Sequence, residues 1–131
     1  MNLVIDTSVV IAVLASEPER KLLVRKTVGV DLIAPDSVHW EVGNALAAML
    51  RRKRINLAQI RSLLKTYEEI PIRFVEVDLL DAMEIAAVHS LYAYDAYILS
   101  CARENRCKLI SLDRGLLNAA RNAGLSTIEV H

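Results

Sequence analysis

The chain has 131 residues, an apolar fraction of 53%, and 16 basic residues balanced by 16 acidic ones. This length and composition predict one globular domain over residues 1–131, and the neutral balance gives no sign of bulk nucleic-acid binding. No run approaches the roughly 18 apolar residues that span a membrane, and no signal peptide is evident. Cys101 and Cys107 lack metal-type spacing and are interpreted as thiols of a reducing cytoplasm.

Short β-prone runs alternate with helical patterns along the whole chain. The first half predicts a strand over 2–5, helices over 7–14 and 16–27, a strand over 31–34 and a helix over 37–53. Ser16-Glu17-Pro18-Glu19 has the pattern of a capping box with an early proline, and Asp36 or Ser37 is the expected cap of the long helix. We expect Pro35 to end the second strand.

The second half continues the alternation. It predicts a helix over 56–69, a strand over 72–75, helices over 78–89 and 94–105, a strand over 108–111, a helix over 116–123 and a strand over 127–130. Asn56 resembles a helix cap. Alternation of this kind predicts an α/β fold with a parallel sheet covered by helices on both faces. In such sheets, ligands bind beyond the carboxyl ends of the strands.

Four acidic residues interrupt apolar segments: Asp6, Glu41, Asp95 and Asp113. Asp6 and Asp113 each close a strand-like run, whereas Glu41 and Asp95 interrupt the apolar stripes of predicted helices. Carboxylates near a core are unfavourable unless a cation compensates them, and hard divalent metals such as Mg²⁺ or Mn²⁺ are their usual partners. Waters on such an ion can attack a phosphodiester. The chain has no GxSxG, Walker A or GxGxxG motif, so metal-dependent phosphate-ester chemistry is indicated.

Each of these acids also has a purely structural interpretation. Asp6, Asp95 and Asp113 suit helix caps or turns, and Glu41 suits the border of a helix stripe whose tip reaches water. Asn44 shares the helix face of Glu41. It could bind a carboxylate or a metal-bound water, or be an ordinary polar flank residue.

Basic and aromatic residues lie close to the acids in sequence. The run 51–54 is explained by solvation and the helix dipole, with phosphate contact as the alternative. Tyr92, Tyr94 and Tyr97 could stack on bases, although we favour packing. Trp40 could line a dimer or partner groove, or pack in the core.

The acids and their neighbours resemble the PIN-domain ribonucleases, and among them the VapC-type toxins of toxin–antitoxin pairs. The matching segments are Leu3-Val4-Ile5-Asp6-Thr7-Ser8, Glu41-Val42-Gly43-Asn44, Tyr94-Asp95-Ala96-Tyr97 and Leu109-Ile110-Ser111-Leu112-Asp113. They occur in the expected order and together cover nearly the whole chain. The resemblance implies a single PIN-like domain with a five-stranded parallel sheet. It also implies an Mg²⁺- or Mn²⁺-dependent endoribonuclease acting on single-stranded or structured RNA.

The resemblance also assigns roles to single residues and implies partners. Its catalytic and metal-binding acids correspond to Asp6, Glu41, Asp95 and Asp113. Thr7 and Ser111 correspond to supporting hydroxyls, with Ser111 standing where threonine is frequent. A further acid common in the family is missing from 114–118. The expected partners are RNA, a second copy of the chain and a small antitoxin protein, for which the helices after Ser16 and Asn56 are candidate surfaces.

Three other functions remain open from the sequence. The first is a housekeeping RNA-processing nuclease of the same family. The second is a phosphoacceptor signalling domain, although its paired acids after the first strand and its lysine after the last are not found here. The third is a non-catalytic binding module that keeps the fold.

Overall fold

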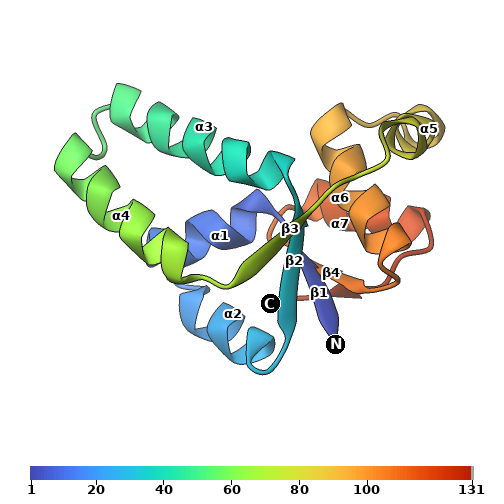
Figure 1. Cartoon of the computed structure of the whole chain (residues 1–131), viewed down its shortest axis with the longest axis horizontal. Coiled ribbons are helices and arrows are strands. Elements are labelled where there is room, and N and C mark those ends of the chain that lie inside the picture. The colour runs from blue at the N-terminus through green and yellow to red at the C-terminus, as the bar shows by residue number, and fades with distance from the viewer. Residues whose placement is uncertain (131) are drawn as a thin grey trace.

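The computed structural model describes residues 1–130 as a five-stranded sheet with seven helices (Figure 1). The strands are β1 (Asn2–Ile5), β2 (Asp31–Pro35), β3 (Ile72–Val75), β4 (Lys108–Ile110) and β5 (Thr127–Ile128). The helices are α1 (Thr7–Leu14), α2 (Arg20–Thr27), α3 (Ser37–Arg51), α4 (Leu57–Glu69), α5 (Leu79–His89), α6 (Ala93–Glu104) and α7 (Arg114–Asn122). All four strand pairings are parallel, in the order β3-β2-β1-β4-β5. The predicted α/β fold with a five-stranded parallel sheet is confirmed.

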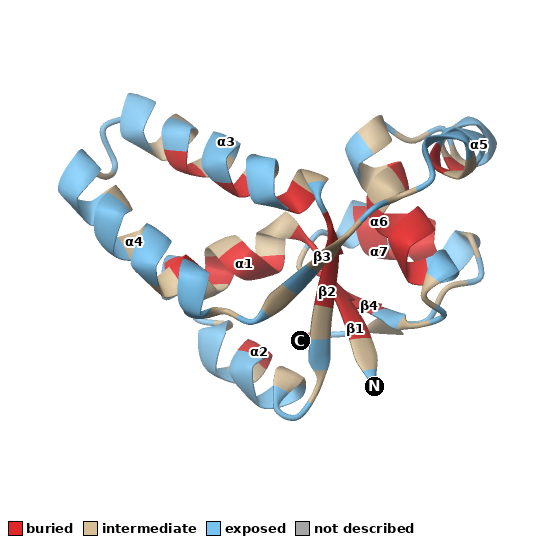
Figure 2. Cartoon of the chain, viewed as in Figure 1, coloured by how far each residue is buried: buried red, intermediate tan, exposed pale blue. Residues whose placement is uncertain are grey.

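The core is centred on β1, which lies in the middle of the sheet. Leu3, Val4 and Ile5 are at most 2% exposed, as expected for a strand covered on both faces. In Figure 1, α1–α4 lie to the left of the sheet and α5–α7 to the right. Buried residues line β1, β2 and β4 and the inward sides of the helices (Figure 2). Within the described part of the chain, no helix is both long and apolar enough to cross a bilayer.

The order of the strands creates a topological switch point between β1 and β4. From β1 the chain runs outward through β2 to β3, then returns to the other side of β1 to form β4 and β5. Crevices that bind ligands in parallel sheets form at such a point, at the carboxyl ends of the strands. Here that end lies after Ile5 and Ile110, which are opposite each other in the register of β1 and β4.

Several predicted boundaries differ from the observed ones. The capping box at Ser16 is wrong, because Ser16 adopts a left-handed conformation (φ 54°) after α1 and α2 begins only at Arg20. Asp36 makes no capping hydrogen bond to α3. The capping box at Asn56 is confirmed, with Gln59 as its reciprocal partner. Pro35 is the last residue of β2 rather than the residue after it, and β4, β5, α3 and α6 end earlier than predicted.

Candidate active site

Asp6 and Ser111 lie side by side because their strands are neighbours. Ile5 is opposite Ile110, so the next residue of each chain segment reaches the same edge of the sheet. The Ser111 hydroxyl donates a hydrogen bond of 2.6 Å to Asp6 Oδ2 and accepts one of 2.9 Å from the Asp113 amide. The structure thus joins two residues that lie more than a hundred positions apart in the sequence.

Asp6 caps α1 and also belongs to the acidic cluster. Its Oδ1 accepts hydrogen bonds from the Ser8 hydroxyl at 2.7 Å and from the Val9 amide at 3.3 Å. Asp6 is only 6% exposed. Burial raises the pKa of Asp6 by more than these hydrogen bonds lower it, and the Asp113 carboxylate raises it further. The cap and site interpretations of Asp6 are therefore compatible.

Ser8 contributes to this cluster, although the sequence did not single it out as a supporting residue. Its hydroxyl donates to Asp6 and accepts a hydrogen bond of 3.0 Å from the Leu112 amide. Ser8 therefore ties the start of α1 to the segment that follows β4. The available signal was a hydroxyl two residues after an acid, a spacing typical of local side-chain hydrogen bonding.

Glu41 reaches the cluster from the second turn of α3. It is half-buried and accepts a hydrogen bond of 3.2 Å from the Thr7 hydroxyl. Burial raises the pKa of Glu41, the Asp6 and Asp95 carboxylates raise it further, and the Thr7 bond partly opposes them. The hydrogen bond to Thr7 brings Glu41 next to the residue that directly follows Asp6.

Asp95 and Asp113 are the other two acids of the cluster, and they come from α6 and from the N-cap position of α7. Asp95 is the third residue of α6, and Tyr92 occupies the N-cap position, so the alternative interpretation of Asp95 as a cap is wrong. Burial raises the pKa of Asp95, with a further contribution from the Asp113 carboxylate. Asp113 is exposed and caps α7 through the Leu116 amide at 3.2 Å. The structure therefore brings all four predicted acids to one edge of the sheet.

Asn44 is not part of this group. It is exposed and lines a shallow surface pocket with Ala47, Ala48, Arg51 and Arg52. None of the hydrogen bonds found within residues 1–130 joins it to an acid. The interpretation of Asn44 as an ordinary polar flank residue fits the structure better than the supporting role.

The donor chemistry of the cluster fits a hard divalent cation. The four acids are carboxylates whose mutual repulsion contributes to three raised pKa values. The two ion pairs within residues 1–130 lie elsewhere, between Arg103 and Asp81 and between Arg121 and Glu129. The geometry is open, since no three acid, histidine or cysteine side chains of the described chain converge tightly enough to hold a metal. Mg²⁺ tolerates such an arrangement, because it typically binds one or two protein carboxylates and keeps several waters.

Comparisons with solved structures agree with this fold. PAE2754 from Pyrobaculum aerophilum is 22% identical, with a TM-score of 0.74, covering 97% of this chain and 92% of that one. A toxin–antitoxin complex from Klebsiella pneumoniae is 15% identical, with a TM-score of 0.65 and 98% coverage of both chains. VapC20 from Mycobacterium tuberculosis, a sarcin–ricin loop cleaving toxin, is 13% identical, with a TM-score of 0.68, covering 97% of this chain and 98% of that one. A comparison with curated protein sequences gives no significant match.

Sequence comparison with protein families identifies the chain independently. The model of the PIN domain matches residues 3–122 and therefore spans all four acids and the whole switch point. The match extends from β1 to the last residue of α7. This chain belongs to the PIN domain family.

Proposed function

We propose that this protein is a metal-dependent endoribonuclease and the toxin of a toxin–antitoxin pair. The observation that supports this most strongly is the cluster of four carboxylates at the switch point, none of which forms an ion pair within the described chain. A structural role alone does not explain why three acids with raised pKa values gather there. Their repulsion is relieved if a divalent ion binds among them.

In this proposal the four acids bind the ion, and neighbouring hydroxyls orient the acids. Asp6, Glu41, Asp95 and Asp113 would bind Mg²⁺ or Mn²⁺, one or two of them directly and the others through the waters that the ion keeps. The bound ion would polarise the phosphate and activate water. Ser8 and Ser111 fix both oxygens of Asp6, and the Thr7 hydroxyl orients Glu41. These hydroxyls partly oppose the rise in pKa that burial causes in Asp6 and Glu41, which favours cation binding.

The toxin assignment draws on the nature of the structural neighbours. One is a toxin–antitoxin complex and another is a toxin that cleaves the sarcin–ricin loop. A homodimer is part of the same proposal. A housekeeping nuclease with the same chemistry is the second candidate, and the two differ in cells. Expression of the toxin arrests growth, and co-expression of its antitoxin restores it, whereas a housekeeping enzyme causes no arrest.

We place the antitoxin on the surface beside α2. An apolar pocket of about 420 Å³ lies between α1, α2 and the turn before β3. Val24 of α2 and Val28, the residue after α2, line it and are 49% and 73% exposed, and basic residues of α2 flank it. This surface fits a segment with apolar side chains between acidic ones. Val24→Glu is expected to weaken the complex in a pull-down with the antitoxin and to leave cleavage unchanged.

Cleavage by purified protein tests the nuclease assignment. Asp6→Asn keeps the size and most hydrogen bonds of the side chain but removes its charge, and it is expected to abolish cleavage of RNA in Mg²⁺. Glu84→Gln removes an exposed carboxylate on α5 and serves as the charge-matched control, with cleavage unchanged. Persistent cleavage by Asp6→Asn at the wild-type rate would show that the chemistry does not depend on this cluster.

A further inference from the structure

The segment that joins α3 to α4 carries a concentration of positive charge. Residues 42–67 contain six basic side chains and no acidic one, although the chain as a whole is neutral. Four of the six are consecutive, Arg51-Arg52-Lys53-Arg54, and all four are exposed. We call these four residues the basic tip. Their charge is not balanced locally, because the two ion pairs within residues 1–130 both lie elsewhere.

The helix dipole explains only part of this charge. Arg51 is the last residue of α3 and Arg52 is its C-cap, so both lie where the dipole favours a cation. Arg54 lies two residues before Asn56, the N-cap of α4, where the dipole of that helix disfavours a cation. Lys53 has a left-handed backbone (φ 59°), which glycine adopts without strain and lysine does not. Four adjacent like charges also repel one another, so a bound polyanion would stabilise the tip.

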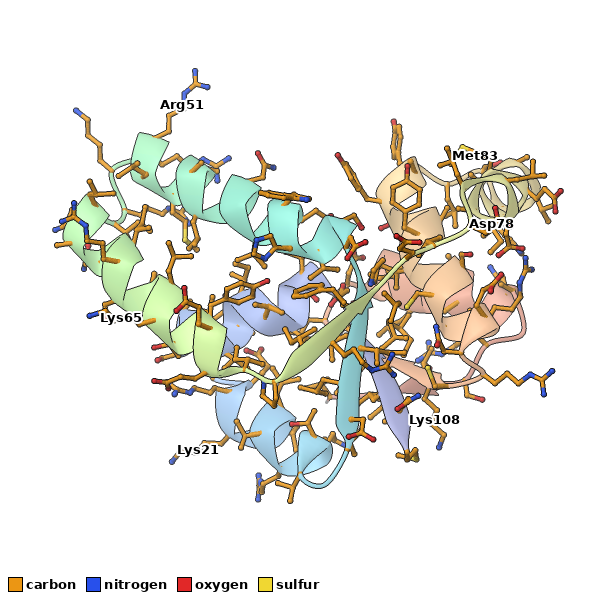
Figure 3. The ribbon with its side chains drawn as sticks, in the orientation of Figure 1. Lys21, Arg51, Lys65, Asp78, Met83 and Lys108 are labelled. Carbon is orange, nitrogen blue, oxygen red and sulfur yellow. The ribbon has the colours of Figure 1, made fainter. Side chains whose placement is uncertain are left out.

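The basic tip lies at the projecting end of two helices. The chain runs away from the sheet in α3 and returns toward it in α4, and the tip joins them at the end far from the strands (Figure 1). Figure 3 shows Arg51 extending away from the body of the molecule and Lys65 extending outward from α4. Arg61 of α4 is also exposed. The tip is therefore open to a large partner.

One face of α3 connects the tip to the acidic cluster. Arg51 is ten residues after Glu41 on this helix, about 15 Å along the axis at roughly 1.5 Å per residue. Between them lies an open surface pocket of about 520 Å³, lined by Asn44, Ala47, Ala48, Arg51 and Arg52. No charged residue occurs in the sequence between Glu41 and Arg51. A long polyanion that reaches the acids can therefore continue along this face to the tip.

The chemistry of the tip favours the phosphate backbone of RNA over an acidic protein segment. Three of its four side chains are arginines, whose planar guanidinium binds a phosphate through two parallel hydrogen bonds. Leu50 and Leu57 flank the tip singly, 41% and 54% exposed, and isolated apolar side chains are normal on a surface. A double helix matches clustered cations better than a single strand, because it presents one phosphate per roughly 1.7 Å of axis rather than one per roughly 3.4 Å.

We propose that the basic tip binds the phosphate backbone of a helical arm of the RNA, about 15 Å or more from the bond that the acids attack. This inference rests on the proposed nuclease function and adds to its substrate class an RNA with a double-helical arm beside the cleaved segment. The tip positions this arm and does not touch the reacting atoms. It therefore contributes to affinity and leaves the chemical step unchanged.

A triple variant removes charge from the tip with little change in its shape. Arg51→Gln, Arg52→Gln and Arg54→Gln are combined, and Lys53 is kept so that its left-handed backbone is not disturbed. Binding of a labelled RNA hairpin, with a stem of one helical turn, is measured by anisotropy in EDTA over a range of salt concentrations. Three lost phosphate contacts should lower the slope of log K against log salt by about 2.7 in magnitude. An unchanged slope would overturn the proposal.

A matched triple variant removes the same charge elsewhere. Arg73→Gln, Arg106→Gln and Lys108→Gln are exposed substitutions on β3, after α6 and at the start of β4. This control should keep the affinity and the salt slope of wild type. An equal loss of slope in both triple variants would mean that the tip attracts RNA only through net charge, and it would overturn the proposal. The tip variant should unfold at a Tm no lower than that of wild type, because repulsion at the tip is relieved.

Steady-state cleavage separates positioning of the arm from catalysis. On the hairpin, the tip variant should raise KM and leave kcat unchanged. On a single strand with the loop sequence alone, both constants should equal those of wild type, since this substrate has no helical arm. An equal rise of KM for both substrates would overturn the helical arm.

The remaining outcomes separate this inference from the proposed function and from a protein surface. If wild type cleaves the hairpin and the tip variant binds and cleaves it equally well, only this inference fails. If wild type neither binds nor cleaves RNA, both fail. If the tip variant binds the hairpin normally but no longer retains the antitoxin in a pull-down, the tip is a protein-binding surface and the proposal is overturned.

Discussion

Removal of the Ser111 hydroxyl is expected to destabilise the fold at the switch point. Ser111→Ala removes the hydrogen bond to Asp6 and the one from the Asp113 amide. A hydrogen bond to a charged group contributes about 1.5–3 kcal/mol, and an amide left unpaired costs roughly 1 kcal/mol more. The expected loss is therefore about 3 kcal/mol. Unfolding entropy of about 2.1 cal/mol/K per residue converts this loss into a fall in Tm of about 11 °C.

The pH dependence of this loss separates the mechanism from simple loss of packing. Ser111 lowers the pKa of Asp6 by bonding its ionised form, so the loss should be larger at about pH 8 than at about pH 4. Differential scanning calorimetry in EDTA measures both values. Ser126→Ala removes an exposed hydroxyl and is the control, with little change in Tm. A fall below about 2 °C for Ser111→Ala, or an equal fall at both pH values, would refute the reasoning.

Two other predictions concern the acids themselves. In EDTA, wild type should gain stability relative to Asp6→Asn as the pH falls from neutral, because the raised pKa of Asp6 means that folding favours its protonated form. The stabilisation by protonated Asp6 is fully present below the ordinary pKa of aspartate. A difference in Tm between wild type and Asp6→Asn that does not change with pH would contradict this prediction. Thr7→Val removes the hydrogen bond to Glu41 and should weaken Mn²⁺ binding about 10-fold, more at low pH than at high pH. Calorimetric titration checks this, and unchanged affinity would show that Thr7 has no supporting role.

The fold was predictable because its signals are local. The apolar run over 3–5, buried on both faces, and the alternation of strands with helices were enough to predict a parallel sheet. The edge at which the acids gather also followed, since the carboxyl ends of parallel strands meet there. The cap at Asn56 was readable for the same reason, because its partner Gln59 is three residues away.

The failure at Ser16 has a physical cause that a local pattern does not show. Ser16 and Glu17 donate their amides to the carbonyls of Val13 and Ala12, which is the Schellman arrangement that ends α1. Ser16 is therefore used to end one helix and is not available to start the next. The sequence contains a pattern for each role, and the structure forms the C-terminal cap of α1 rather than an N-terminal cap of α2.

The details of the site required the tertiary structure. The contact between Asp6 and Ser111 depends on the register of β1 against β4, which no local pattern contains. Helix periodicity placed Asn44 on the face of Glu41 but did not show that this part of α3 is open to solvent. In the same way, nothing in the sequence distinguished the exposed Tyr92 and Tyr94 from the packed Tyr97.

A thermal shift measured against divalent metal tests the central claim most directly. If the four carboxylates form a cation site, Mg²⁺ or Mn²⁺ binds the native state preferentially and raises the Tm of wild type, by about 2.7 kcal/mol of added stability at one hundred times the Kd. Asp6→Asn should lose most of this shift, while Glu84→Gln keeps it. An unchanged Tm of wild type at saturating metal, or an equal shift in Asp6→Asn, would contradict the account.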